Sequence, residues 1–215
     1  RLWENRMIWA GLELMGEVPF TDVIIHSTVL AADGRRMSKS LGTGIDPLET
    51  IDAHGADATR YGLLKISSTQ DVRFSPGAIE EGRKLANKLW NATRFALMNL
   101  GGETPASLGE PDPAALQLAD RWILSRLARV NRETAERYGN YGLGEAAKGL
   151  YEFAWNEVCD WYVELIKRRL QDPAQQRTAR QVLAKVLQEL LVMLHPLMPH
   201  LSEELWHGLT GESEV

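Results

Sequence analysis

The residues best suited to chemistry lie in one short segment between two glycines. The segment runs from Gly34 to Gly42 and carries three cations and two hydroxyls. In order along the chain, these side chains are Arg35, Arg36, Ser38, Lys39 and Ser40. Cations and hydroxyls are donors to anionic oxygens, and the glycines let the backbone close on a ligand. The segment predicts a phosphate-binding loop, with an exposed basic turn before a helix as the alternative.

Elements before this loop are expected to hold it in place. Apolar residues recur at spacings of three to five over residues 3–15, which predicts a helix that ends at Gly16. Residues 23–30 are rich in β-branched side chains and precede the turn signal Asp33-Gly34. This composition predicts a single buried strand that leads into the loop.

After the loop, the pattern becomes helical. Asp46 followed by Pro47 opens a short helix, and Asp57 is expected to cap another. Beyond residue 75 the apolar residues recur with the period of a helix. The expected helices cover residues 76–100, 113–138, 143–170, 174–194 and 200–209. The span 101–113 is rich in glycine and proline, which predicts a loop.

Composition and charge exclude several kinds of protein. Hydrophobic residues make up 44% and charged residues 25% of the sequence, as is typical of a chain that folds. A net charge of −5 argues against a non-specific coat on nucleic acid, although it leaves room for a local basic face. No signal peptide is visible, and no apolar run approaches the roughly 18 residues of a membrane span. The single cysteine, Cys159, fits a reducing compartment, so we expect a cytoplasmic protein.

The loop resembles a known signature. Residues 36–40 read Arg-Met-Ser-Lys-Ser, similar to the KMSKS signature of class I aminoacyl-tRNA synthetases, with arginine in place of the first lysine. The similarity extends over residues 33–42, 45–47 and 55–58. It implies that ATP, with Mg²⁺ bound through its phosphates, is held by Arg36, Met37, Ser38, Lys39 and Ser40. It also implies that Lys39 is catalytic, because this lysine would neutralise charge on the departing pyrophosphate.

Longer stretches narrow the resemblance to the valyl-tRNA synthetases. They are residues 70–75, 86–95 and 151–162. Residues 195–206 are shared with leucyl and isoleucyl enzymes, which stay open as alternatives. The resemblance implies valine, ATP and tRNA(Val) as partners.

The same resemblance implies the domain organisation and a mainly α fold. Residues 1–72 would be the end of a Rossmann-type α/β catalytic domain, with one strand, helices and the loop. Residues 73–215 would be an α-helical, anticodon-binding bundle. The family's HIGH-type signature does not occur, and Arg1 stands where an initiator methionine is expected. We therefore expect a segment of a longer enzyme that is inactive alone; a tRNA-binding helical module with a vestigial loop is the alternative.

Basic and aromatic side chains of the expected bundle are candidates for RNA contact. The basic ones are Arg83, Lys84, Lys88, Arg94, Arg121, Arg126, Arg129, Arg132, Arg137, Lys167, Arg168 and Arg169. The aromatic ones are Trp90, Trp155, Trp161 and Trp206. Charges on helix faces commonly pair with Glu, which is the alternative for the first set. Helical spacing beside Leu and Val favours a core role for the tryptophans over stacking on bases.

Four further residues receive structural interpretations or none. His195 and His200 flank prolines at a helix break, which predicts structural hydrogen bonds rather than catalysis or metal binding. Cys159 has no cysteine partner, so neither a zinc site nor a nucleophile is expected there. His26 is assigned no role, and no metal site is predicted.

Overall fold

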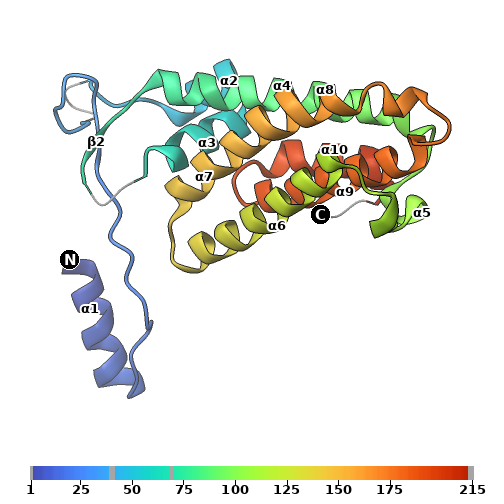
Figure 1. The fold of residues 1–215 in the computed structure, drawn as a ribbon. Coiled ribbons are helices and arrows are strands. Elements are labelled where there is room, and N and C mark those ends of the chain that lie inside the picture. Colours follow the sequence, from blue (N-terminus) through green and yellow to red (C-terminus); the bar gives the residue numbers. More distant parts are fainter. Residues whose placement is uncertain (1, 39–41, 68–69, 213–215) are drawn as a thin grey trace.

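The structure, a computed structural model, describes residues 2–38, 42–67 and 70–212 (Figure 1). The first elements are α1 Leu2–Ala10, π-helix η1 Gly11–Met15, β1 Val29–Leu30, α2 Pro47–His54, α3 Ala56–Lys65, β2 Val72–Arg73, α4 Pro76–Leu100 and α5 Pro105–Leu108. The others are 3₁₀ helix η2 Pro113–Ala115, α6 Leu118–Gly139, α7 Leu143–Glu152, π-helix η3 Phe153–Tyr162, α8 Val163–Ile166, 3₁₀ helix η4 Arg169–Gln171, α9 Gln176–Leu194 and α10 Pro199–Thr210. The predicted mainly α class is confirmed. No membrane-spanning helix is found among the described residues.

The N-terminal helices α1 and η1 stand apart from the other described helices (Figure 1). Gly16 ends them with a φ of 74°, as predicted, because glycine adopts this left-handed conformation without strain. The expected buried strand over residues 23–30 is wrong in its first part. Residues 23–25 are exposed, and β1 includes only Val29 and Leu30. A strand is buried by its neighbours, and within the described residues β1 pairs only with β2 and, through a single bridge at Leu30, with Arg36.

Strands β1 and β2 form a two-stranded parallel sheet. Val29 pairs with Val72 and Leu30 with Arg73, and the N–H of Phe74 donates to the carbonyl of Leu30 at 2.8 Å. The sequence indicated only one strand, because two residues are too few to show an alternating pattern. The sheet brings the segment after α3 beside the start of the loop.

Helices α2 and α3 connect the loop to the bundle. Asp46 caps α2 as predicted, since its Oδ1 accepts from the N–H of Leu48 at 2.9 Å. Asp57 does not cap α3, whose N-cap residue is a glycine. Its carboxylate instead accepts from the N–H groups of His200 at 3.3 Å and Leu201 at 2.5 Å, at the start of α10. The prediction that Asp57 caps the helix beginning beside it was wrong, because its carboxylate caps α10, which is distant in sequence.

Two glycines allow α3 to pack closely on α4. A Cβ at Gly62 would lie 2.7 Å from a side-chain carbon of Ile79, and one at Gly82 would lie 2.9 Å from the ring of Tyr61. Real Cβ atoms do not approach other atoms so closely, so larger residues would push the helices apart. The buried Tyr61 ring fills the space beside Gly82. These contacts fix α3, and with it the end of the loop segment, to the bundle.

The helices after residue 75 share one apolar core. Helix α4 spans the predicted residues 76–100, whereas the predicted helix over residues 143–170 is divided into α7, η3, α8 and η4. Leucine, valine and alanine dominate the core, which draws on α4, α6, α7, η3, α9 and α10. The predicted loop over residues 101–113 contains the short helix α5, opened by a capping box between Thr104 and Ser107. Glycine and proline around this turn hid its helix signal.

Candidate functional site

A tight turn opens the candidate phosphate-binding loop. Gly34 has a φ of 86°, and its N–H donates to the carbonyl of Ala31 at 2.8 Å. Arg35 pairs with Asp33, whose two carboxylate oxygens lie 3.0 Å from its backbone N and 2.7 Å from its Nε. The hydrogen bond from the Arg35 side chain lowers the pKa of the Asp33 carboxyl. The charge of Arg35 is therefore shared with Asp33 rather than left for a ligand.

The next residues extend and then close the loop. Arg36 is exposed, forms an antiparallel bridge with Leu30, and makes no ion pair within the described residues. Met37 and Ser38 are half-buried. The N–H of Ser38 donates to Oγ1 of Thr43 at 3.0 Å, and the N–H of Thr43 donates to the carbonyl of Ser38 at 3.2 Å. This reciprocal pair joins the two sides of the loop, and Thr43 was not predicted to take part.

Two predicted site residues, Lys39 and Ser40, lie outside the described residues. The structure therefore locates Arg36, Met37 and Ser38 of the predicted set, on the first side of the loop. The roles assigned to all five remain predictions.

A further cation reaches the loop from β2. Pairing with Leu30 places Arg73 beside the turn, where a Cβ on Gly34 would lie 3.2 Å from its guanidinium nitrogen. Arg73 is exposed and makes no ion pair within the described residues. Arg36 and Arg73 thus flank Leu30 with two guanidinium groups free to bind an anion. Sequence reasoning missed Arg73, because only the strand pairing brings it to the loop.

Most basic side chains of the bundle are already paired. Arg126 donates to both carboxylate oxygens of Glu157, at 2.6 and 2.7 Å, and this hydrogen bonding raises the pKa of its guanidinium. Other pairs are Arg83–Glu80, Lys88–Asp160, Arg129–Glu133, Arg137–Glu133, Lys167–Glu164 and the buried Arg169–Asp120. Arg121 donates to the carbonyl of Leu116 at 3.2 Å. The helix-face alternative fits Arg83, Arg129, Arg137 and Lys167, whose partners lie three or four residues away on the same helix or turn. Lys88, Arg126 and Arg169 instead pair with residues distant in sequence.

Four candidates have no such partner. Lys84, Arg94, Arg132 and Arg168 are exposed and make no ion pair within the part of the chain that the structure describes. Exposed and unpaired cations are the ones that can contact phosphate without breaking an existing pair. Among the basic candidates for RNA contact, these four are the exposed ones that the described residues leave without an ion pair.

The four tryptophans divide into two groups. Trp206 is buried, and Trp155 is half-buried, stacked on Tyr151 at 5.4 Å with the Lys88 ammonium 4.2 Å from its ring centre. Trp90 and Trp161 are 46% and 63% exposed. The predicted core role is therefore wrong for Trp90 and Trp161, because helical spacing does not say which faces a neighbouring helix covers.

The remaining residues behave as structural groups. Nδ1 of His195 lies 2.9 Å from Oγ of Ser202, which confirms a structural hydrogen bond at the helix break. His200 contributes its backbone N–H to Asp57. Burial raises the pKa of the Cys159 thiol to about 11, with Asp160 adding to the effect and Lys88 opposing it. Among the described residues, no group of three His, Cys, Asp or Glu is arranged to hold a metal ion.

Comparison with known proteins matches both halves of the chain. The family model described as "tRNA synthetases class I (I, L, M and V)" matches residues 1–75, and "Anticodon-binding domain of tRNA ligase" matches residues 120–215. The valine–tRNA ligase of Parasynechococcus marenigrum (strain WH8102) is 62% identical over 99% of this chain and 25% of its own length. That of Carboxydothermus hydrogenoformans (strain ATCC BAA-161 / DSM 6008 / Z-2901) is 50% identical over 99% of this chain and 24% of its own length. The chain spans about a quarter of the length of these relatives.

Solved structures agree on the fold. A LeuRS from Agrobacterium radiobacter K84, in a ternary complex with tRNA and LeuAMS, superposes with a TM-score of 0.75 at 21% identity, covering 94% of this chain and 24% of that one. The methionyl-tRNA synthetase of Mycobacterium tuberculosis bound by methionyl-adenylate gives 0.68 at 22% identity, covering 84% of this chain and 36% of that one. At such identities the likeness shows the fold alone.

The chain belongs to the class I tRNA synthetases, because the two family models take in the loop on one side and the bundle on the other. Within that class, its relatives at 50% and 62% identity over nearly all of its length are valine–tRNA ligases. The resemblance in residues 70–75, 86–95 and 151–162 is thus confirmed, and the valyl interpretation is preferred to the leucyl and isoleucyl ones.

Proposed function

We propose that this chain is the part of an ATP-dependent valine–tRNA ligase that supplies the KMSKS-type loop and the tRNA-binding bundle. The observation that carries the proposal is the 62% identity to a valine–tRNA ligase over 99% of the chain, because it includes both regions. In this function the carboxylate of valine attacks the α-phosphorus of ATP, and the bond from that phosphorus to pyrophosphate breaks. The valyl group then passes from the adenylate to tRNA(Val), with release of AMP.

In the first step, the loop binds the triphosphate. Lys39 neutralises the charge that develops on pyrophosphate, while Arg36, Met37, Ser38 and Ser40 hold the nucleotide. The reciprocal hydrogen bonds between Ser38 and Thr43 support this assignment, because they hold the first side of the loop in place. The unpaired guanidiniums of Arg36, which bridges to Leu30, and of Arg73 on β2 add positive charge beside the loop, where phosphate oxygens would lie. Mg²⁺ would be held by those phosphates rather than by the chain.

The two regions divide this work. We assign residues 1–72 to the end of the catalytic domain and residues 73–215 to anticodon binding, and we place the ligase in the cytoplasm. The exposed, unpaired cations of the bundle support RNA binding, since neutralising phosphates is what gives such proteins their affinity.

The loop's role is tested by ATP–pyrophosphate exchange in the intact ligase. Lys39→Ala should lower the exchange rate constant about 100- to 1,000-fold, the usual cost of losing one charge-stabilising donor, with a smaller change in the KM for ATP. Arg35→Ala is the matched control, because Arg35 is already paired with Asp33 and should change the rate only slightly. An unchanged exchange rate for Lys39→Ala, with tRNA binding retained, would reduce the chain to an RNA-binding module.

The tRNA specificity of the chain is tested by measuring its affinity for three RNAs over a salt series. These are valine tRNA, the same tRNA with an altered anticodon, and leucine tRNA. A preference for valine tRNA that disappears with the altered anticodon is expected if the bundle reads the anticodon. Equal, weak and strongly salt-dependent binding to all three would contradict this part of the proposal.

A further inference from the structure

Arg73 lies at the carboxyl end of the small sheet. It is the last residue of β2, and it pairs in parallel register with Leu30, the last residue of β1. On the other side of Leu30, Arg36 forms an antiparallel bridge. The carboxyl end of parallel strands is the edge at which open α/β sheets bind their ligands. Both arginines are therefore placed where a ligand of the loop would arrive.

The pairing also sets the spacing of the two arginines. Residues directly opposite each other on neighbouring strands direct their side chains to the same face of a sheet. Arg36 and Arg73 are each opposite Leu30, so they share one face with their backbones about 10 Å apart, which is two strand spacings. Two guanidiniums on long side chains can reach one anion across this gap. An anion that meets both must carry several oxygens, as a chain of phosphates does.

The Arg73 guanidinium rests against the turn that opens the loop. A Cβ added to Gly34 would lie 3.2 Å from Nη2, 3.3 Å from Nε and 3.5 Å from Cζ of Arg73. Because three atoms of the planar group lie at nearly equal distances, its face rather than its edge meets the glycine. The N–H donors of a guanidinium lie in its plane, so they are directed past Gly34. Gly34 leaves room for this contact because it has no side chain.

Nearby carboxylates do not occupy Arg73. The carboxylate of Asp33 pairs with Arg35, and that of Asp71 accepts from the backbone N–H of Thr28 at 2.9 Å. Arg73 is exposed and makes no ion pair or side-chain hydrogen bond within the described residues. A guanidinium held by its face, with its donors open, is oriented for bidentate contact with phosphate oxygens.

We propose that Arg73 is a catalytic residue of the ligase reaction, which binds the β- and γ-phosphates of ATP from the sheet side of the loop. When the valine carboxylate attacks the α-phosphorus, the bond from that phosphorus to the oxygen bridging to the β-phosphate breaks. The electron pair of this bond stays on pyrophosphate. The N–H groups of Arg73 donate to the oxygens on which the charge develops, and Arg73 keeps its own protons. The inference rests on the proposed function, and it adds a phosphate-binding residue from outside the signature.

The test is ATP–pyrophosphate exchange by the intact ligase, together with its affinity for a non-hydrolysable valyl-adenylate analogue. Arg73→Gln should lower the exchange rate constant about 10- to 100-fold and raise the KM for pyrophosphate, because one charged donor is lost. Its affinity for the analogue should be unchanged, since the analogue has no β- or γ-phosphate. Arg73→Lys should recover only part of the rate, because an ammonium keeps the charge but lacks the planar fork and the flat face that rests on Gly34.

Arg132→Gln is the matched control. Arg132 is also an exposed arginine without an ion pair within the described residues, but it lies on α6 of the bundle rather than on the sheet. The substitution removes the same charge from the chain. It should leave the exchange rate, the KM for pyrophosphate and the affinity for the analogue unchanged.

The outcomes distinguish this inference from the proposed function. A wild-type ligase without valine-dependent exchange would overturn the proposed function itself. Exchange by Arg73→Gln at the wild-type rate would overturn only the role of Arg73. Equal losses of affinity for pyrophosphate and for the adenylate analogue would also overturn it, because Arg73 would then support the shape of the loop instead of contacting phosphate.

Discussion

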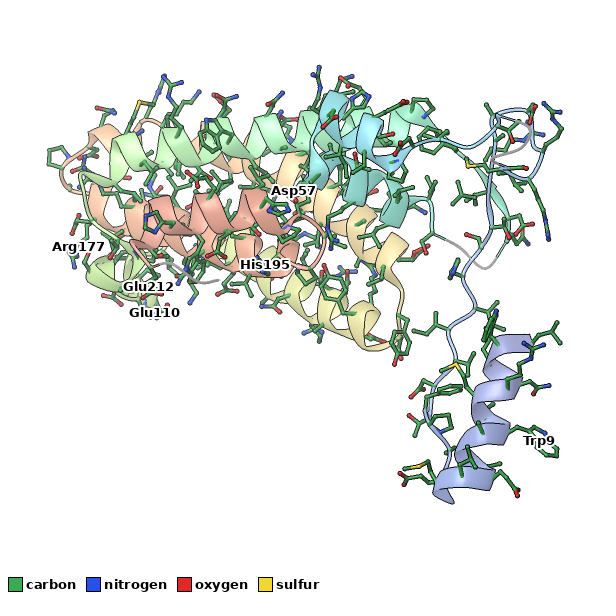
Figure 2. All side chains as sticks on the ribbon, turned by 180° about the vertical axis from the view of Figure 1, so that it is seen from behind. Trp9, Asp57, Glu110, Arg177, His195 and Glu212 are labelled. Atoms are coloured by element: carbon green, nitrogen blue, oxygen red, sulfur yellow. The ribbon has the colours of Figure 1, made fainter. Side chains whose placement is uncertain are left out.

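The N-terminal segment and the helical bundle use similar apolar residues with opposite results. In residues 2–30, the side chains of Trp3, Trp9 and Ile25 are each more than 70% exposed, and Trp9 stands on α1 away from the bundle (Figure 2). In the bundle, Leu150 and Leu187 are almost wholly buried. An apolar face is stabilising only where a second face covers it. In the bundle, the apolar face of each helix is covered by the apolar face of another. In the N-terminal segment, no second apolar face covers the first within the described residues.

Polar groups show the same contrast. Inside the bundle, Asp120 is fully buried, yet it accepts from Arg169 at 2.7 Å, from the Tyr162 hydroxyl at 3.0 Å and from the N–H of Gln117 at 3.0 Å. At the loop, Arg36 and Arg73 have no ion pair within the described residues. The buried charge of Asp120 is thus satisfied inside the bundle, whereas these two exposed charges at the loop are left open within the described residues. Breaking each region in turn tests this division.

The largest effect is expected at the buried pair of the bundle. Asp120→Ala leaves Arg169 buried without a counter-charge, and the free energy of unfolding should fall by about 3–5 kcal/mol. Urea unfolding followed by circular dichroism measures the change. Glu133→Ala is the control, because it breaks exposed pairs with Arg129 and Arg137, which solvent screens, and should cost much less. Comparable losses for the two variants would refute the contrast between interior and surface charges.

A pair of apolar truncations compares the two regions directly. Leu187→Ala should lower the free energy of unfolding of the chain by about 2–5 kcal/mol, because it leaves a cavity in the core. Ile25→Ala should change it by no more than about 0.5 kcal/mol, because Ile25 is 74% exposed. Urea unfolding of this 215-residue chain measures both. A large fall in the free energy of unfolding for Ile25→Ala would mean that Ile25 packs against another part of the protein, which would contradict the contrast between the two regions.

The bundle should also suppress the reactivity of its thiol. Burial raises the pKa of Cys159 from 9.0 to about 11, so less thiolate is present at any lower pH. A difference of about two pH units predicts alkylation by iodoacetamide at pH 8 roughly 100-fold slower than for a small thiol. The rate should keep rising up to about pH 11, as followed by mass spectrometry. Cys159→Ser gives the background, and a rate that levels off below pH 9 would show that the thiol is not shielded.

Local signals predicted much of this fold, and non-local pairing accounts for what they missed. The bounds of α4 follow from Pro76 at its first turn and Gly101 after its last, which are features of the sequence itself. Strand β2 exists only because β1 lies beside it. At the site, the motif located Arg36, Met37 and Ser38, but it gave no sign of Arg73 or of Thr43. Arg73 reaches the loop through strand pairing that no window of sequence contains. Thr43 lies close to Ser38 in sequence, but its residue type alone does not show that it closes the loop.

The smallest of the expected effects lies at the joint between the two regions. Asp57, next to the loop-bearing segment, caps α10 of the bundle, and Arg60 on the same helix donates to the carbonyl of Pro196 at 3.0 Å. Asp57→Ala should lower the free energy of unfolding by about 0.5–2 kcal/mol, because two N–H groups lose their acceptor. Asp57→Asn should recover part of this, since an amide oxygen still accepts. Hydrogen exchange should quicken at the N–H groups of His200 and Leu201. If exchange there is unaltered, α10 is held by its apolar face alone, and the two regions are joined by packing rather than by this cap.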